Sequence, residues 1–170
     1  DIFESEAFEI VKQTIDARAE RDFAEPHYVH DFKCGSLDFD QPKAEKPNYV
    51  FMHIANALSP QSFFTEKKYL LDCFISLLDK SSTEYGAEYI ETETWLNSFP
   101  KWLEYFPEEW MNNMGERDEN VMWHYGFWGQ FINKRGIFDK GLGSQLRVTG
   151  RFPFFPHHSW CSIGEMRKHI

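Results

Sequence analysis

The sequence has no apolar run close to the roughly 20 residues that a membrane-spanning helix needs. Its opening segment, DIFESEAFEI, is acidic where a secretory signal would be basic and then apolar. Cysteine is scarce too. Cys34, Cys73 and Cys161 are an odd set without close spacing, which favours free thiols over a disulfide framework. We therefore expect a soluble protein in the reducing cytoplasm.

Positive charge is also in short supply, because 18 Lys and Arg stand against 27 Asp and Glu and give a net charge of −9. Such a balance disfavours nucleic acid and anionic membranes as partners. The charge is uneven, since residues 134–170 carry a net +5 and leave −14 for residues 1–133. This basic segment either packs against the acidic bulk or forms a pocket for a small anion.

Several motifs of enzyme families are missing. There is no H-E-x-x-H, C-x-x-C, G-x-G-x-x-G, G-x-x-x-x-G-K or G-x-S-x-G segment. Zinc proteases, zinc ribbons, Rossmann dehydrogenases, P-loop enzymes and α/β-hydrolases are therefore disfavoured. We expect no organic cofactor.

Metal binding has only weak support in the sequence. His27 and His30 point to opposite faces of an extended segment, and adjacent His157 and His158 have the same problem. A two-histidine, one-carboxylate set exists only if the fold brings together three distant groups, namely His53, Glu91 or Glu93, and His124. We expect no metal.

The composition is that of a folded protein, with 42% hydrophobic and 18% aromatic residues in 170. A chain of this length is the size of one domain, so residues 1–170 are predicted to form a single globular domain. Apolar residues recur on one helical face from Ile2 to about Arg21, which predicts an amphipathic helix. The polar segment 38–48 predicts a loop.

The middle of the chain predicts a βαβ unit. Residues 48–56 and 87–96 have the composition and alternation of strands. Between them, Ser59 and Pro60 predict the start of a helix over about 60–84, and Gly86 predicts its end. Strands joined in this way are parallel neighbours. The predicted fold class is α+β, or α/β: a small mixed sheet with one βαβ unit, covered by several helices.

Ligands of open α/β sheets tend to bind beyond the carboxyl ends of the strands. Alternation places His53 on the same face as Glu91 and Glu93, which would form a histidine–carboxylate pair for acid–base chemistry. The alternative is a surface pair of glutamates and a hydrogen-bonded core histidine. The polar residues that follow the two strands are Asn56, Ser59, Trp95, Asn97 and Ser98.

The polar residues after the second strand can also be explained by helix capping instead of ligand binding. Asn97 or Ser98 can cap the first of two short helices in residues 97–113, and Pro107 separates the two.

The segment WHYGFWGQF, residues 123–131, combines aromatic rings with polar edges and two glycines. It is either packed core or the wall of a ligand site, in which case His124, Tyr125, Trp128 and Gln130 are candidate ligand contacts. Gly126 and Gly129 would let another backbone approach closely. A further helix is predicted through Phe138 and Leu146, ending at Gly150.

In the tail, Ser162 and Glu165 form an S-x-x-E capping box, which predicts a last helix from just after Ser162. Cys161 would then lie beside a helix N-terminus near His157 and His158, where a lowered pKa would make it a candidate nucleophile. The alternative is a buried structural thiol.

Two functions remain open. The first is a small-molecule enzyme that uses His53, Glu93 or His124 for acid–base chemistry in an aromatic-walled pocket, with Arg147 or Arg151 binding an anionic substrate group. The second is a non-catalytic domain that binds a ligand or partner through an aromatic surface including Trp110, Trp123 and Trp128.

Overall fold

The computed structural model describes residues 31–119 and 125–170 continuously. In the first 30 residues it describes only positions 9, 12, 13, 16, 17 and 20. The chain divides into two units, Asp1–His30 and Asp31–Ile170. In the first unit the six described residues are helical and exposed, and Lys12 pairs with Asp16 one turn later at 2.6 Å. Five of the six are polar and the sixth is Ala17, and the residues predicted to form the apolar face of the N-terminal helix lie outside the described residues.

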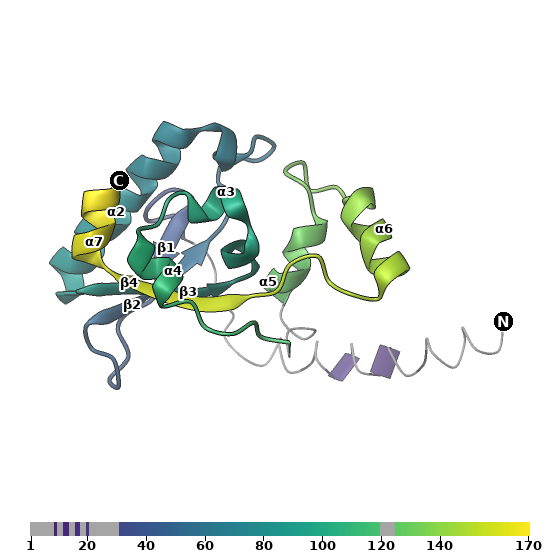
Figure 1. Cartoon of the computed structure of the whole chain (residues 1–170), viewed down its shortest axis with the longest axis horizontal. Coiled ribbons are helices and arrows are strands. Elements are labelled where there is room, and N and C mark those ends of the chain that lie inside the picture. Colours follow the sequence, from purple (N-terminus) through teal and green to yellow (C-terminus); the bar gives the residue numbers. More distant parts are fainter. Residues whose placement is uncertain (1–8, 10–11, 14–15, 18–19, 21–30, 120–124) are drawn as a thin grey trace. The chain divides into compact units, whose positions relative to one another are not determined.

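The second unit is built on a mixed sheet with the strand order β1 (Leu37–Phe39), β2 (Tyr49–Ile54), β3 (Tyr89–Thr94) and β4 (His157–Ser162) (Figure 1). Strands β2 and β3 are parallel, whereas β1 and β4 pair antiparallel at the two edges. Helix α2 (Lys67–Tyr85) connects the parallel pair. The predicted α+β class, the mixed sheet and the βαβ unit are therefore confirmed.

Helix α2 begins later than the sequence predicts. Ser59 and Pro60 lie in a turn, and neither residue starts the helix. Ser62 instead caps the short helix η1 (Phe63–Thr65), where its hydroxyl accepts the Phe64 N–H at 3.3 Å. The predicted end is correct: Gly86 has a φ of 65° and terminates α2, because a left-handed residue favours glycine.

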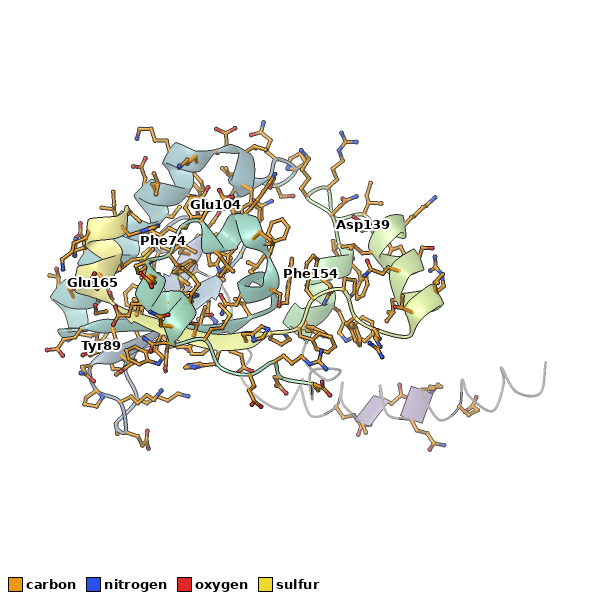
Figure 2. All side chains as sticks on the ribbon, viewed as in Figure 1. Phe74, Tyr89, Glu104, Asp139, Phe154 and Glu165 are labelled. Atoms are coloured by element: carbon orange, nitrogen blue, oxygen red, sulfur yellow. The ribbon has the colours of Figure 1, made fainter. Side chains whose placement is uncertain are left out.

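The core lies on one face of the sheet. Val50, Met52, Ile90 and Cys161 are fully buried there, and α2 contributes Phe74 and its apolar neighbours to the same cluster. The short helices α3 (Pro100–Leu103) and α4 (Glu108–Asn112), both predicted, add the core tryptophans at 102 and 110. Figure 2 shows Phe74 among these helices. On the other face, the side chains of β2 and β3 are half-buried or exposed, whereas Asp38 in β1 is buried.

The C-terminal third contains α5 (Tyr125–Trp128), η4 (Gly129–Phe131), α6 (Lys140–Thr149) and α7 (Ile163–His169). Gly150 ends α6 with a φ of 64°, and Ser162 caps α7, as predicted. Within the second unit, α5 and α6 lie at the opposite end from α7 (Figure 1). No helix in the described part of the chain has an apolar stretch long enough to cross a bilayer.

Two strands are missing from the sequence prediction. Strand β1 includes Asp38 and Phe39, which were predicted to lie at the start of a loop. Strand β4 consists of the six residues just before the last helix. Both are stabilised by pairing with distant strands: β1 with β2, and β4 with the whole of β3. Local composition carries little of that information, because strand propensity depends strongly on tertiary context.

Candidate functional site

A cavity of about 810 Å³ lies beyond the carboxyl ends of β2 and β3. Its polar and aromatic lining comes from three directions: the end of β2, the end of β3, and the segment from α5 to the loop before α6. This position agrees with the general rule for α/β sheets. The side chains that matter for its chemistry are His53, Asn56, Glu93, Trp95, Phe127 and Lys134.

The segment WHYGFWGQF contributes one wall through Gly126, Phe127 and Gly129. Among the described residues, nothing lies within 4 Å of a Cβ atom added to either glycine. No described backbone packs closely against these glycines, so the expectation that they admit one stays a prediction. His124 and the side chain of Tyr125 lie outside the described residues, so their placement as ligand contacts stays a prediction.

His53, which lines the cavity, has a carboxylate partner. Its Nε2 lies 2.8 Å from Oδ2 of Asp40, and the imidazole is about one quarter exposed, at 23%. The contact is an ion pair when the imidazole is protonated, rather than an aligned hydrogen bond. The backbone explains the proximity: Asp38 pairs with His53 in the sheet, and the Asp40 N–H donates to the Phe51 carbonyl at 3.0 Å.

The predicted pairing of His53 with Glu91 is not what the structure shows. Glu91 accepts from Lys46 Nζ at 2.7 Å and lies 3.1 Å from Nε2 of His158, which is on the adjacent strand. That histidine could not be assigned to this position without knowing that β4 exists. Glu93 is exposed and lines the cavity together with His53.

Near its end, the basic segment 134–170 pairs with the acidic part of the second unit, because Arg167 lies 2.7 Å from Asp79 in α2. None of its cations from 134 to 151 forms an ion pair with a described Asp or Glu; these are Lys134, Arg135, Lys140, Arg147 and Arg151. Lys134 lines the cavity, and its carbonyl accepts the Ser59 hydroxyl at 3.2 Å, which ties this loop to the end of β2.

The two arginines predicted at the rim lie elsewhere. Arg147 lines a second cavity between η4 and α6, and Arg151 lines neither cavity. Trp128, another predicted ligand contact, also belongs to the second cavity and is 40% exposed. The helical phase of α5 and η4 directs Phe127 toward the first cavity and Trp128 toward the second.

Asn97 does not reach the cavity, and it does not cap a helix. It is 1% exposed, and its Oδ1 accepts the indole N–H groups of Trp102 at 3.2 Å and Trp110 at 3.3 Å. Its Nδ2 donates to the His157 carbonyl at 2.7 Å. Asn97 is thus fully used in satisfying two buried indoles, as polar groups in a core require.

Gln130 is also structural. Its Nε2 donates to the carbonyls of Phe127 and Phe154, and its Oε1 accepts the Phe154 N–H at 3.1 Å. Phe154 lies between the sheet and α6 (Figure 2), and its ring is 5.8 Å from that of Trp95 in the cavity wall. Gln130 therefore holds the aromatic wall in place without lining the cavity.

Cys161 lies in β4 and is fully buried in the core. Burial, together with the nearby carboxylates of Glu109 and Glu165, raises the pKa of its thiol. The expected lowering of this pKa is therefore wrong, because desolvation outweighs the helix N-terminus beside it. All three cysteines are buried and unpaired.

The surface band expected for a partner-binding domain is not formed as predicted, because Trp110 is completely buried. Trp123 lies outside the described residues. Within the described residues, no group of three or more His, Cys, Asp and Glu side chains is placed to hold a metal ion.

Two residues of the candidate site, Asp40 beside His53 and Lys134 in the cavity lining, were absent from the candidates drawn from the sequence. Asp40 belongs to a polar segment typical of a loop, and only the pairing of β1 with β2 brings it to His53. Lys134 was counted within the basic segment but was not singled out, since nothing local distinguishes it from Arg135.

The chain has no match among known proteins: no family model, curated protein or solved structure is significantly similar to it.

Proposed function

We propose that the protein is an enzyme that acts on a small anionic molecule bound in the cavity at the ends of β2 and β3. The observation that carries this proposal is that His53 lines the cavity while its Nε2 lies 2.8 Å from Oδ2 of Asp40. A histidine is the side chain best suited to accept and return a proton near neutral pH. A carboxylate beside it stabilises the imidazolium and limits the orientation of the ring.

Glu93 supplies a second titratable group on the same wall. With one group accepting a proton and the other donating it, the cavity has both partners of a general acid–base mechanism. We assign the accepting role to Glu93, because an exposed carboxylate is a proton acceptor near neutral pH. His53 is the candidate for the donating role, because Asp40 stabilises its imidazolium.

The other side chains that line the cavity are suited to binding a ligand rather than to transferring a proton. Phe51, Trp95 and Phe127 offer apolar surface to the body of a ligand, as in most small-molecule sites. Lys134 has no ion pair with a described carboxylate and lies at the same cavity, so it is the group we assign to the anionic part of the substrate. Asn56 is held by the Gln61 carbonyl at 2.7 Å and shapes the mouth.

We further propose that the protein works in the cytoplasm. Three buried free thiols are compatible with a reducing compartment and would be unusual in a secreted domain of this size.

The second candidate function is a non-catalytic ligand-binding domain. The apolar side chains exposed around the second cavity favour it, since surfaces of this kind often mark binding sites. The two candidates differ in one respect: an enzyme changes its ligand chemically, and a binding domain releases it unchanged.

The experiment that tests the proposal is incubation of the purified protein with a cellular extract of small molecules, followed over time by mass spectrometry. We expect one anionic compound to disappear while a product accumulates, and we expect His53→Gln to slow this conversion by about 10²–10⁴-fold. His169→Gln, which alters an exposed histidine in α7, is the matched control. Conversion by His53→Gln at the wild-type rate, or enrichment of a compound without conversion, would refute the enzyme proposal.

A further inference from the structure

A second cavity, of about 370 Å³, lies between η4 and α6. Helix α6, which lines it, lies at the end of the second unit that is remote from α7 (Figure 1). Its volume falls within the range of roughly 300–1,000 Å³ that is usual for small-molecule sites. The side chains that decide its chemistry are Trp128, Phe131, Ile132, Phe138, Leu146 and Arg147.

The walls of this cavity are aromatic and aliphatic. The ring centroids of Trp128 and Phe131 are 5.8 Å apart, and those of Phe131 and Phe138 are 6.4 Å apart in a stacked arrangement. Gly143 in α6 makes the arrangement possible, because a Cβ at that position would overlap the Phe138 ring. A flat apolar molecule would find ring faces and edges on more than one side here.

The walls are held in place by the backbone. Asp139 donates its N–H to the Phe131 carbonyl at 2.6 Å, and its carboxylate caps α6 by accepting the Leu142 N–H at 3.0 Å. The two elements that border the cavity, η4 and α6, are therefore held together by hydrogen bonds near the start of α6.

Apolar surface remains exposed at the mouth. Ile132 is 50% exposed and Phe138 is 46% exposed. Exposed apolar side chains that form a contiguous patch usually mark a binding surface, whereas scattered ones do not.

Arg147 is the single charged side chain among the described residues that line this cavity. No described carboxylate pairs with it. A guanidinium binds a carboxylate through two parallel hydrogen bonds, a geometry that an ammonium does not offer. The second cavity thus combines apolar walls with one cationic group suited to a planar anion.

We infer that the second cavity binds an amphiphilic monocarboxylate, a molecule with a flat apolar body and a single carboxylate that pairs with Arg147. The inference is independent of the proposed enzyme activity, because the two cavities use different charged residues. The first cavity contains groups of both signs, whereas the second has one cation in apolar surroundings.

Calorimetric titration with 2-naphthoate and its neutral analogue 2-naphthamide tests this inference, because the two probes have nearly the same shape. We expect 2-naphthoate to bind about tenfold more tightly or better, the contribution of a charged hydrogen-bonded pair. Arg147→Gln should remove that preference, whereas Arg151→Gln, in the same basic segment but outside both cavities, should keep it.

Lys134→Gln separates the two cavities, because Lys134 lines only the first. We expect it to leave the affinity for 2-naphthoate unchanged. Absence of 2-naphthoate binding, equal affinity for the two probes, or an equal loss in Arg151→Gln or Lys134→Gln would overturn the inference. Each substitution is at an exposed side chain, so the variants should fold, which circular dichroism would verify.

Discussion

Oδ2 of Asp40, the residue that follows β1, lies 2.8 Å from Nε2 of His53, which is in β2 and lines the first cavity. The pair links an edge strand to the parallel centre of the sheet. In the proposed mechanism, Asp40 acts through His53 and is a positioning residue.

The first prediction concerns this pair. Asp40→Asn should slow the conversion of substrate by about tenfold or more, because an amide does not stabilise the imidazolium as a carboxylate does. The free energy of unfolding should change by less than about 1 kcal/mol, since the carboxylate is partly exposed. The rate of substrate loss and a urea titration measure the two effects.

Asp79→Asn is the matched control for the charge, because Asp79 forms an exposed ion pair with Arg167 in another part of the molecule. An equal fall in rate for both variants would show that net charge matters and the His53 contact does not.

The second prediction concerns the buried amide of Asn97. Asn97→Ala should lower the free energy of unfolding by about 3 kcal/mol or more, because two buried indole N–H groups lose their acceptor. Asn113→Ala, which removes one half-buried bond to the Trp160 carbonyl, should lower it by about 1 kcal/mol. Equal effects in urea unfolding would contradict the role assigned to Asn97.

The third prediction concerns the start of α7. Glu109 accepts both the Ser162 N–H at 3.0 Å and the Ser162 hydroxyl at 2.9 Å, the N–H being the bond that Glu165 would take in a complete capping box. Glu109→Ala should therefore destabilise the fold by about 1–3 kcal/mol, and Glu165→Ala should cost less. Glu108→Ala, at the exposed neighbouring position, is the control. Thermal unfolding of the three variants ranks their stabilities. A larger loss of stability in Glu165→Ala than in Glu109→Ala would contradict the role assigned to Glu109.

The fourth prediction concerns pH. Burial raises the pKa of the Cys161 thiol, so the unfolded chain loses this proton at a lower pH than the folded chain. The contribution to stability is full below the unfolded pKa of about 8.5 and declines above it, by at most about 1.4 kcal/mol per pH unit. Cys161→Ala should remove the contribution of this thiol to the slope of the unfolding free energy against pH.

Urea unfolding of wild type and Cys161→Ala at several pH values between 7.5 and 10 would measure the two slopes. Other titrating groups contribute equally to both proteins, so the difference belongs to Cys161. Identical slopes would mean that the thiol is not shielded in solution.

The sequence predicts the parts of this fold that local patterns determine. The βαβ unit, the end of α2 at Gly86, the end of α6 at Gly150 and the cap at Ser162 all follow from spacing and from residues with special backbone preferences. The edge strands β1 and β4 do not, because three residues in one case and a polar histidine pair in the other become strands only through their partners.

The same division applies to the candidate site. His53 and Glu93 could be placed at the cavity from strand alternation and the rule for strand ends. Their partners could not, since Asp40 depends on β1 and His158 depends on β4. Asn97 was a plausible ligand contact from its position after β3. Only the arrangement of two distant indoles shows that its acceptor is already used.

The central claim is that the cavity at the strand ends is where the substrate binds, and Gly126 offers the most direct test. Gly126 lines the first cavity, and in the part of the chain that the structure describes nothing lies within 4 Å of its Cβ position. A larger side chain there would narrow the cavity, and leucine favours helix more than glycine. Gly164→Leu, in α7 and equally unobstructed, is the control. The measurement is the rate at which each purified variant consumes the substrate found with wild type. We predict that Gly126→Leu remains folded and loses conversion while Gly164→Leu retains it, and a folded Gly126→Leu that converts substrate at the wild-type rate would contradict the account.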